Sequence, residues 1–529
     1  MDAETRILIS VQPAAALAAR PRLFAALEAA FPVVFSPSAP GAPDPAAIIS
    51  IAEDPGARAA PGHDEARVPV LVVGGAAADG TPPEDVQLAS GAAIDARVRG
   101  VVLEDRLVRV PLVPRDGDDV LAVAGSGPVW IRSRGRVDRV RAVLPELAPD
   151  EVLYSLLSRR AVGAVALVQF LRAVCEPAGW RPPALRAAFV FDDPNLRWRS
   201  YGHIDYRRLA VHADAHGYHA AMAMIPLDAW RPHRPTAALF AGRSDRLSLV
   251  FHGNDHVKDE LMRPSEVSAA LVMAAQSVRR IARFERRSGL SVDRVMMPPH
   301  GMCSAAVVQA LGEVGFDALC ALHPRPWTEQ PPADPLLAGW RPAEFVHGCA
   351  VIARIPLCSS LASIALRAFL DHPLVIYGHH EDVAGGFEPL AEAAALVNGL
   401  GPVKWCSVGE IARGNYSRCL QGERLVVRPH ARRVRVEPIA GARTLCIEAP
   451  VSNEAAGLRG WSVGSGPIRA FEEDVPIGIT SPIEIRLHGS RDVDPERVAA
   501  PSWRPWPRVR RAATEARDRA LALRPAVNR

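Results

Sequence analysis

The chain has 529 residues, of which 49% are hydrophobic and 23% charged, proportions typical of a globular protein. This length exceeds that of one ordinary domain, so two to four domains are expected. The net charge of +4 is small for the length, and overall charge therefore does not indicate a nucleic-acid partner.

Signals for export or disulfide formation are weak along the whole chain. The first ten residues, MDAETRILIS, lack the basic and apolar regions of a signal peptide. The longest apolar stretch, residues 161–171, is short for a bilayer and is flanked by arginines, so no transmembrane segment is expected. The eight cysteines occur singly without a CxxC pair, which favours reduced thiols. These features predict a cytoplasmic protein.

Residues 1–148 alternate short apolar runs, such as TRILISV and VPVLVVGG, with helical or proline-rich stretches. This pattern predicts a small open sheet, and we interpret the region as an N-terminal α/β accessory domain. Gly125, Ser126 and Gly127 predict a hairpin turn, because a phosphate-binding loop would need a following helix. Residues 149–184 are predicted to form a helical linker.

Residues 185–416 have a regular rhythm in which apolar runs are followed by amphipathic helices. The runs include AAFVF, LSLVF, RVMMP and PLVIYG. This alternation predicts parallel strands that are buried on both faces. Seven or eight such units predict a closed or nearly closed β/α barrel, so the fold class is α/β.

The helical pattern stops near residue 420. Residues 420–490 contain strand-like runs separated by turns, which predict a small β-sandwich. Residues 491–529 are a proline- and arginine-rich basic tail, for which a solvated terminal helix is favoured over contact with an anionic surface. Trp461 and Trp503 are expected to pack in a core rather than bind sugar.

An unusual set of polar residues follows the strands of the predicted barrel. Aspartate, proline and asparagine at a strand end are also typical of a simple turn. In β/α barrels, however, the C-terminal strand ends meet at one rim, which carries the catalytic groups. The residues are, in chain order, Asp192 and Asp193, His252 and His256, His300, and His379 and His380.

Two imidazoles four residues apart, together with one carboxylate, can hold a divalent ion and leave a position open for water. Hydrolysis at such an ion also needs a base for the water and an acid for the leaving group. Only one of the two adjacent aspartates can easily bind the ion, and the other can serve as the base. His379, which arrives from another strand, can be the acid.

These residues resemble the polysaccharide deacetylase superfamily, the NodB-like carbohydrate esterases, of which the chain looks like a divergent member. The resemblance implies a distorted seven-stranded β/α barrel that removes acetyl groups from N-acetylated sugars with zinc, or with cobalt or nickel. FVFDDPN resembles the first motif and implies that Asp192 is the base and Asp193 a metal ligand. FHGNDH resembles the second motif and implies that His252 and His256 are the other ligands. LVIYGHH implies His379 as the acid, with His380 as the alternative.

The sequence departs from the family pattern at several positions. The family's third motif has an arginine that braces the catalytic aspartate, and Met297 stands where it would be. His300 then falls where an aromatic residue is usual and is expected to replace part of the lost function. Gly253 replaces the serine or threonine of the second motif. Trp327 and Trp405 are candidates for the tryptophan of the fourth motif.

Five further residues are candidates for contacting the substrate or supporting the ligands. Trp198 and Tyr201 follow the aspartates and could stack on sugar rings, although the segment could equally just begin a helix. Asp255 lies between the two metal histidines, where it could also be ordinary charge at a helix start. The remaining two are His300 and His380.

The sequence therefore predicts a metal-dependent hydrolase that removes acetyl groups from an N-acetylated sugar or glycan precursor. It would act on amide bonds other than peptide bonds, with a carbohydrate as its partner. Two alternatives stay open. One is an inactive carbohydrate-binding or assembly protein on the same barrel, favoured by the missing arginine. The other is a hydrolase of a non-sugar amide or ester.

Overall fold

A computed structural model describes residues 6–38, 43–55, 68–75, 82–106, 110–133, 136–149, 151, 153–322, 340–450, 457–477 and 481–522. The chain divides into two compact units. The first contains Met1–Trp180, Ala333–Arg341 and Leu361–Phe369, and the second contains Arg181–Pro332, Pro342–Ser360 and Leu370–Arg529.

The first unit is built on a nine-stranded mixed sheet of order β2-β1-β3-β4-β9-β8-β7-β5-β6. The strands from β2 to β9 in this order are parallel, and those from β9 to β6 are antiparallel. Ala124 pairs with Gly127, which confirms the predicted hairpin turn at residues 125–126. The strands are β1 (Ile7–Gln12), β2 (Val33–Pro37), β3 (Ala47–Ala52), β4 (Val70–Gly74), β5 (Glu84–Leu88), β6 (Val102–Asp105), β7 (Asp119–Ala124), β8 (Gly127–Ser133) and β9 (Val137–Arg141).

The helices of the first unit correct the predicted linker. Helices α3 and α4 lie within residues 149–184, yet they belong to this unit because α4 buries most of its surface in it. An 18-residue window from Ala161 is long and apolar enough to cross a membrane, but 61% of it is buried, as in a core helix. The helices are α1 (Ala14–Ala18), α2 (Pro21–Ala30), α3 (Tyr154–Arg159), α4 (Ala161–Cys175), the short η2 (Glu176–Ala178) and α9 (Leu361–Phe369).

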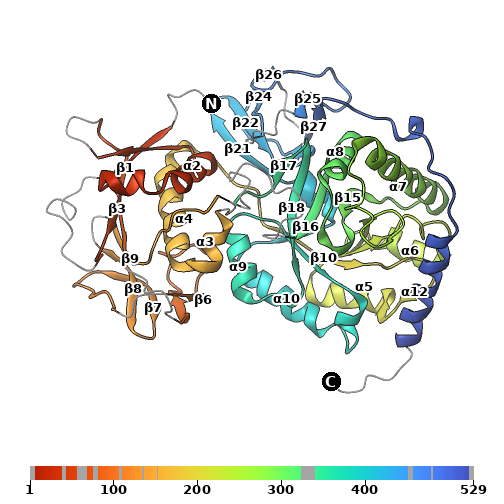
Figure 1. Cartoon of the computed structure of the whole chain (residues 1–529), viewed down its shortest axis with the longest axis horizontal. Helices are drawn as coiled ribbons and strands as arrows, with labels where there is room; N and C mark the ends of the chain where they lie inside the picture. The colour runs from red at the N-terminus through yellow and green to blue at the C-terminus, as the bar shows by residue number, and fades with distance from the viewer. Residues whose placement is uncertain are drawn as a thin grey trace. The chain divides into compact units, whose positions relative to one another are not determined.

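The second unit contains a closed barrel of parallel strands, which confirms the predicted fold class (Figure 1). The ring runs β10-β13-β14-β15-β16-β18-β19 and closes by pairing of β19 and β13 with β10. The short β20 (Lys404–Trp405) adds to β10, and β17 (Glu344–Val346) pairs antiparallel with β18. The barrel strands are β10 (Arg186–Asp192), β13 (Ala220–Met224), β14 (Leu247–His252), β15 (Asp293–Met297), β16 (Ala318–Leu322), β18 (Cys349–Pro356) and β19 (Leu374–Gly378).

Helices follow most of these strands and cover the barrel from outside, as α5 to α8 do in Figure 1. The strands are almost wholly buried because the helices cover one face while the barrel interior fills the other. A two-stranded ribbon, β11 with β12, and two short 3-10 helices, η3 and η4, lie in the loops that follow the strands. These elements are α5 (Tyr206–His216), α6 (Arg234–Gly242), α7 (Val267–Ser288), α8 (Ala305–Glu313), α10 (Glu388–Gly399), α11 (Val408–Arg413), β11 (Ser200–Tyr201), β12 (Ile204–Asp205), η3 (Pro299–Gly301) and η4 (His380–Val383).

Two small sheets follow the barrel and belong to the same compact unit. They share an apolar core that includes the fully buried Trp461, whose indole donates a hydrogen bond to the Ala470 carbonyl. The predicted core position of Trp461 is confirmed. One sheet has the order β21 (Tyr416–Gln421), β22 (Arg424–Pro429), β24 (Thr444–Ile447), β26 (Val475–Pro476), and the other β23 (Arg433–Val436), β27 (Ile483–Gly489), β25 (Leu458–Val463).

The C-terminal tail is not the solvated helix that its composition suggested. After η6 (Pro495–Arg497), the helix α12 (Trp506–Ala522) buries Arg511, Glu515 and Asp518. Their spacing of four and three residues places them on one helix face, which meets charged groups of the barrel loops. Trp503, in contrast, is 72% exposed, so its predicted core position is wrong.

Candidate metal centre

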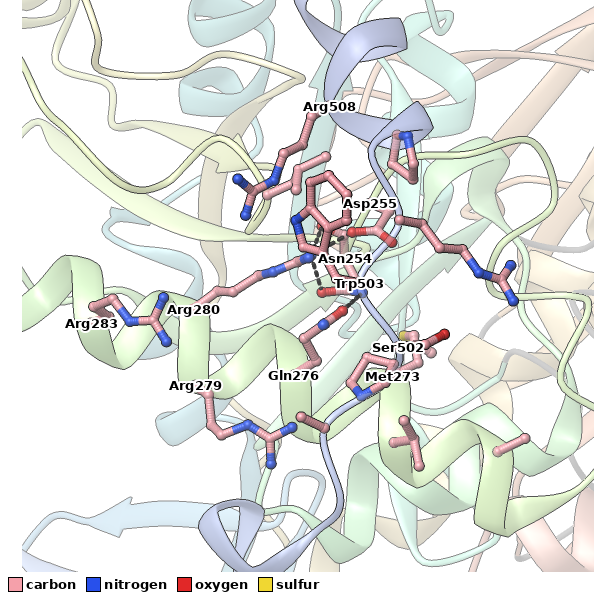
Figure 2. Close-up of a pocket in the computed structure, with 17 residues that line it drawn as sticks. Asn254, Asp255, Met273, Gln276, Arg279, Arg280, Arg283, Ser502, Trp503 and Arg508 are labelled. Atoms are coloured by element: carbon pink, nitrogen blue, oxygen red, sulfur yellow. Dashed lines mark hydrogen bonds and ion pairs between the residues drawn. The ribbon is translucent and has the colours of Figure 1, made fainter.

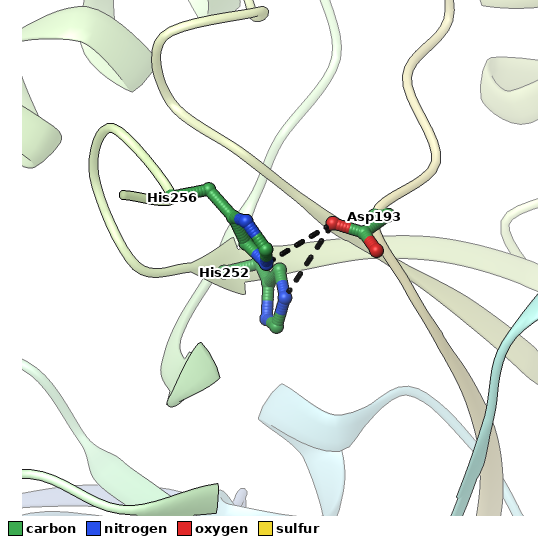
Figure 3. Close-up of side chains that lie close together, drawn as sticks. All are labelled: Asp193, His252 and His256. Carbon is green, nitrogen blue, oxygen red and sulfur yellow. Dashed lines mark ion pairs between the residues drawn. The ribbon is translucent and has the colours of Figure 1, made fainter. Parts of the chain in front are cut away.

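Three predicted residues, Asp193, His252 and His256, lie together at the C-terminal end of the barrel (Figure 3). The Oδ1 atom of Asp193 is 3.3 Å from Nε2 of His256 and 3.8 Å from Nε2 of His252. One ligand atom from each residue lies within 4.8 Å of the other two. One carboxylate and two imidazoles at this spacing are a donor set that suits a divalent transition metal.

His252 is oriented by the neighbouring strand. It ends β14, is 2% exposed, and its Nδ1 atom lies 3.0 Å from the backbone carbonyl of Met297. Since a carbonyl only accepts, Nδ1 carries the proton and Nε2 keeps its lone pair for an ion. The register of β14 against β15 shifts between Val250 and Phe251, just before this residue, as is common beside functional sites.

The loop between the two histidines is organised by Glu260. This buried carboxylate accepts hydrogen bonds from the backbone amides of Asn254, at 2.7 Å, and Asp255, at 2.8 Å. Gly253 has a φ of +61°, and a Cβ there would lie 2.1 Å from Oε1 of Glu260. The glycine that replaces the usual serine or threonine is therefore required by this loop, because no side chain fits beside Glu260.

Asp193 is held in a strained position with an unsatisfied oxygen. Its φ is +81°, which is rare for a non-glycine residue. Its Oδ1 atom is buried and accepts no hydrogen bond from the described residues. Buried oxygens almost always have a partner, and backbone strain concentrates at functional sites. Both observations fit a carboxylate oxygen that is reserved for a cation.

The charge states of the three residues suit metal binding. Burial raises the pKa of Asp193, but His252, His256, Arg511 and His379 outweigh it and bring this pKa to about 2. Burial lowers the pKa of His252. Burial and the neighbouring His252 together lower the pKa of His256 to about 4. At neutral pH the group is therefore one carboxylate with two neutral imidazoles, the protonation state that metals bind.

These pKa shifts predict an unusual pH dependence of zinc affinity. Two histidines of ordinary pKa, about 6.5, would cost the affinity about 100-fold as the pH falls from 7.5 to 5.5. Because the pKa of His256 is about 4 and that of His252 is also lowered, we expect a loss below about tenfold over this range. Competition titrations with a chromogenic chelator would measure it, and a 100-fold loss by pH 5.5 would contradict the lowered pKa values.

Asp192 is paired with an arginine that the sequence interpretation missed. The Nη1 atom of Arg354, near the C-terminal end of β18, lies 2.8 and 3.1 Å from the two carboxylate oxygens of Asp192. Both side chains are buried, and the Arg354 guanidinium also donates to the Pro298 carbonyl and stacks on the ring of Tyr377. The expected loss of the bracing arginine at Met297 is thus corrected, because another strand supplies a guanidinium to the same carboxylate.

The three remaining strand-end histidines differ in exposure. His379 is exposed and is one of the residues that lower the pKa of Asp193. His380 is 3% exposed and packs against Tyr201 and His203. His300 is exposed with a φ of +61°, and its ring centroid lies 6.0 Å from that of His256. His379 and His300 are accessible at the metal centre, whereas His380 is a packed residue.

Three other candidates contact charged groups of the helices around the barrel. Tyr201 is fully buried and donates a hydrogen bond to Asp518, so it cannot stack on a sugar. Trp198 is 56% exposed but lies under the guanidinium of Arg519. Asp255 forms an ion pair with Arg280 at 2.5 Å. Charged groups of α12 and α7 thus engage all three side chains, and the roles predicted for Trp198 and Asp255 stay predictions.

Of the two candidates for the fourth-motif tryptophan, Trp405 does not reach the centre. Trp405 pairs with Ala187 near the start of β10, at the end of the strand opposite Asp192. Its indole donates a hydrogen bond to Asn398 and packs on Phe189. Trp327 lies outside the described residues.

Arg511 of α12 is a further residue beside the centre. It is 4% exposed, pairs with Asp228 at 2.5 Å, and donates to the Asp193 carbonyl at 2.8 Å and to the Tyr201 hydroxyl at 3.0 Å. Arg510 donates a hydrogen bond to the His256 carbonyl. The C-terminal helix thus holds the backbone of two of the three candidate ligands.

Arg511→Met is expected to lower the free energy of unfolding by about 3 kcal/mol, because it leaves the buried Asp228 poorly paired. Arg517→Met, on the same helix but 65% exposed, should change it by less than about 0.5 kcal/mol. Denaturant titrations of both variants measure the difference. Equal free energies of unfolding for Arg511→Met and Arg517→Met would show that Arg511 does not hold α12 on the barrel.

Comparisons with known proteins give no family model and no curated protein that matches this chain. Among solved structures, the chain is similar to a protein assigned as a polysaccharide deacetylase from Mycobacterium smegmatis, with 15% identity, a TM-score of 0.32, and coverage of 44% of this chain and 91% of that one. It is also similar to a family 4 carbohydrate esterase from Streptomyces lividans, with 13% identity, a TM-score of 0.25, and coverage of 41% and 88%. A third is a mutant of BA3943, a CE4 family pseudoenzyme with restored enzymatic activity, with 12% identity, a TM-score of 0.26, and coverage of 44% and 69%.

TM-scores this low carry no weight by themselves, so the fold rests on the strand order and the chemistry on the geometry of the metal centre. These three solved structures are described as a polysaccharide deacetylase, a family 4 carbohydrate esterase and a mutant of a CE4 family pseudoenzyme.

Proposed function

We propose that the protein is a metal-dependent hydrolase that removes acetyl groups from an N-acetylated carbohydrate. One observation carries the proposal: the open set of three ligands lies directly beside the buried pair of Asp192 and Arg354. A protein that only binds metal has no need of a second carboxylate held by its own arginine. The chemistry of the donor set fits zinc, with cobalt or nickel as alternatives.

Each residue has a definite task in this proposal. Asp193, His252 and His256 would hold the ion, which would polarise the acetamide carbonyl and lower the pKa of a water molecule. Asp192 would accept the proton of that water, and the guanidinium of Arg354 would keep the carboxylate in place. His379, exposed beside the centre, would donate a proton to the departing amine nitrogen.

The main alternative is an inactive binding protein on the same barrel, and the geometry changes the support for it. That alternative drew its support from the missing arginine at Met297. With Arg354 paired to Asp192, this support is gone. The substrate class itself rests on the resemblance of the strand-end motifs, and a non-sugar acetamide would use the same groups.

Release of acetate from N-acetylated sugars tests the proposal directly. The protein is loaded with zinc and incubated with N-acetylglucosamine and its short β-1,4-linked oligomers, and free acetate is measured enzymatically. We expect release that stops with a chelator and returns with added zinc. No acetate from any acetylated sugar or simple acetamide, with zinc bound, would overturn the proposal.

A further inference from the structure

A groove lined by arginines lies beside the metal centre, between α7 and the segment that precedes α12 (Figure 2). One cavity of about 570 Å³ is lined by Arg279, Arg280, Arg283, Arg504 and Arg508. A second cavity of about 450 Å³ also contains Arg280, Arg283 and Arg508 in its wall. Because the two share these side chains, they form one groove, which we call the arginine groove.

The sequence concentrates positive charge here by helical spacing. Gln276, Arg279, Arg280 and Arg283 are three or four residues apart on α7 and therefore share one face of the helix. The C-terminal segment contributes Arg504 and Arg508 from the opposite side. The first cavity has one carboxylate in its wall, that of Asp255, and the second has that of Asp228, which pairs with Arg511 and Arg197.

Most of this charge is not neutralised by the protein. Asp255 is engaged by Arg280 at 2.5 Å. Arg279 donates to the Val498 carbonyl at 2.7 Å, while its Nη2 atom is buried without a hydrogen-bond partner in the described chain. Within the described ranges, Arg283 and Arg508 have no carboxylate within 4.0 Å. A concave site that gathers guanidinium groups without carboxylate partners attracts anions, and the guanidinium fork binds phosphates, like carboxylates, through two parallel hydrogen bonds.

An aromatic side chain in the same wall narrows the class of ligand. Trp503 lines the cavity and is 72% exposed, and Figure 2 shows its indole beside Asn254 and Asp255. An exposed indole offers a face on which a base or a sugar ring can stack. The size of the cavity lies within the range of small-molecule sites.

We propose that the arginine groove binds an organic diphosphate, with the diphosphate held by Arg283 and Arg508 and the attached ring stacked on Trp503. The site is separate from the candidate metal ligands, although the loop that carries His256 contributes Asn254 and Asp255 to its wall. The proposal therefore does not depend on the proposed hydrolase activity.

Calorimetric titration of the full chain with uridine diphosphate as the probe tests this site. Loss of one charge-assisted contact to phosphate costs about tenfold in Kd, so Arg283→Gln and Arg508→Gln should each weaken binding about tenfold and the double variant about 100-fold. Trp503→Leu should raise the Kd for uridine diphosphate about fivefold and leave the Kd for pyrophosphate unchanged. Arg286→Gln, one turn further along α7 and outside the groove, is the matched control and should bind like the parent.

Asp193→Ala should bind uridine diphosphate like the parent, which separates this proposal from that of the metal centre. No binding at about 1 mM probe would overturn the proposal, since a weaker Kd leaves almost no specific interaction. Equal binding by the parent and the Arg283→Gln/Arg508→Gln variant would also overturn it. Binding to phosphatidylglycerol vesicles without binding of uridine diphosphate would overturn it in favour of a membrane surface.

Discussion

Asp192→Asn should lower the rate of acetate release about a thousandfold while leaving the bound metal in place. The amide keeps the shape of the side chain but cannot accept the proton of the attacking water. The three candidate metal ligands are unchanged, so zinc content should stay that of the parent. Acetate release and elemental analysis on the same preparation measure the two quantities.

Folding and local charge must be controlled in this experiment, because the neutral amide leaves the buried Arg354 without a charged partner. Circular dichroism shows whether the variant is folded. Asp255→Asn is the matched control: it makes the same chemical change in the loop between the two metal histidines, where the side chain pairs with Arg280. A folded, zinc-loaded Asp192→Asn protein with the parent's rate would exclude Asp192 as the base.

Arg354→Met should reduce both stability and activity. Removing one partner of a buried ion pair leaves an uncompensated charge and typically costs about 3 to 5 kcal/mol. We also expect acetate release to fall about 100-fold, because Asp192 loses the group that positions it. Denaturant unfolding and acetate release measure the two effects.

A double variant separates the effect of Arg354 on the position of Asp192 from its effect on the free energy of unfolding. In Asp192→Asn/Arg354→Met neither member of the pair carries a buried charge, so most of the lost stability should return while activity stays absent. Arg354→Lys keeps the positive charge but lacks the planar guanidinium fork. Compared with Arg354→Met, it should restore the free energy of unfolding more fully than the rate of acetate release. An Arg354→Met protein with normal kcat would show that the pair is structural only.

The barrel and the triad could be predicted from sequence because both depend on local patterns. Apolar runs separated by amphipathic helices specify parallel strands, and the residue after each strand must lie at the same rim. Asp193, His252 and His256 are all within one residue of a strand end or on the short loop that follows it. That these three residues lie together can therefore be predicted without knowing how the side chains pack.

Arg354 could not be found in the same way, because its role depends on which strands are neighbours across the barrel. It lies inside the run AVIARIP, whose apolar pattern by itself predicts only one more buried strand. The run did contain a signal, since a charged residue in a strand buried on both faces must have a buried partner. Which carboxylate that is follows only from the closed ring of strands.

The docking of α12 was missed for a related reason. Its composition is that of a solvated helix, and charged residues far apart in sequence give no indication of their partners. Arg511, Glu515 and Asp518 share one face, but the same spacing also occurs in helices that contact only water. Asp228, Arg197 and Tyr201, which receive this face, lie about 300 positions earlier in the chain.

Metal content measured by elemental analysis tests the account most directly, on the zinc-loaded and dialysed parent, Asp193→Ala and Asp255→Ala. The account predicts about one zinc per chain in the parent and in Asp255→Ala, and almost none in Asp193→Ala, which lacks the one carboxylate of the set. A parent that binds no zinc, or an Asp193→Ala protein that binds it as the parent does, would contradict the assignment of the metal centre.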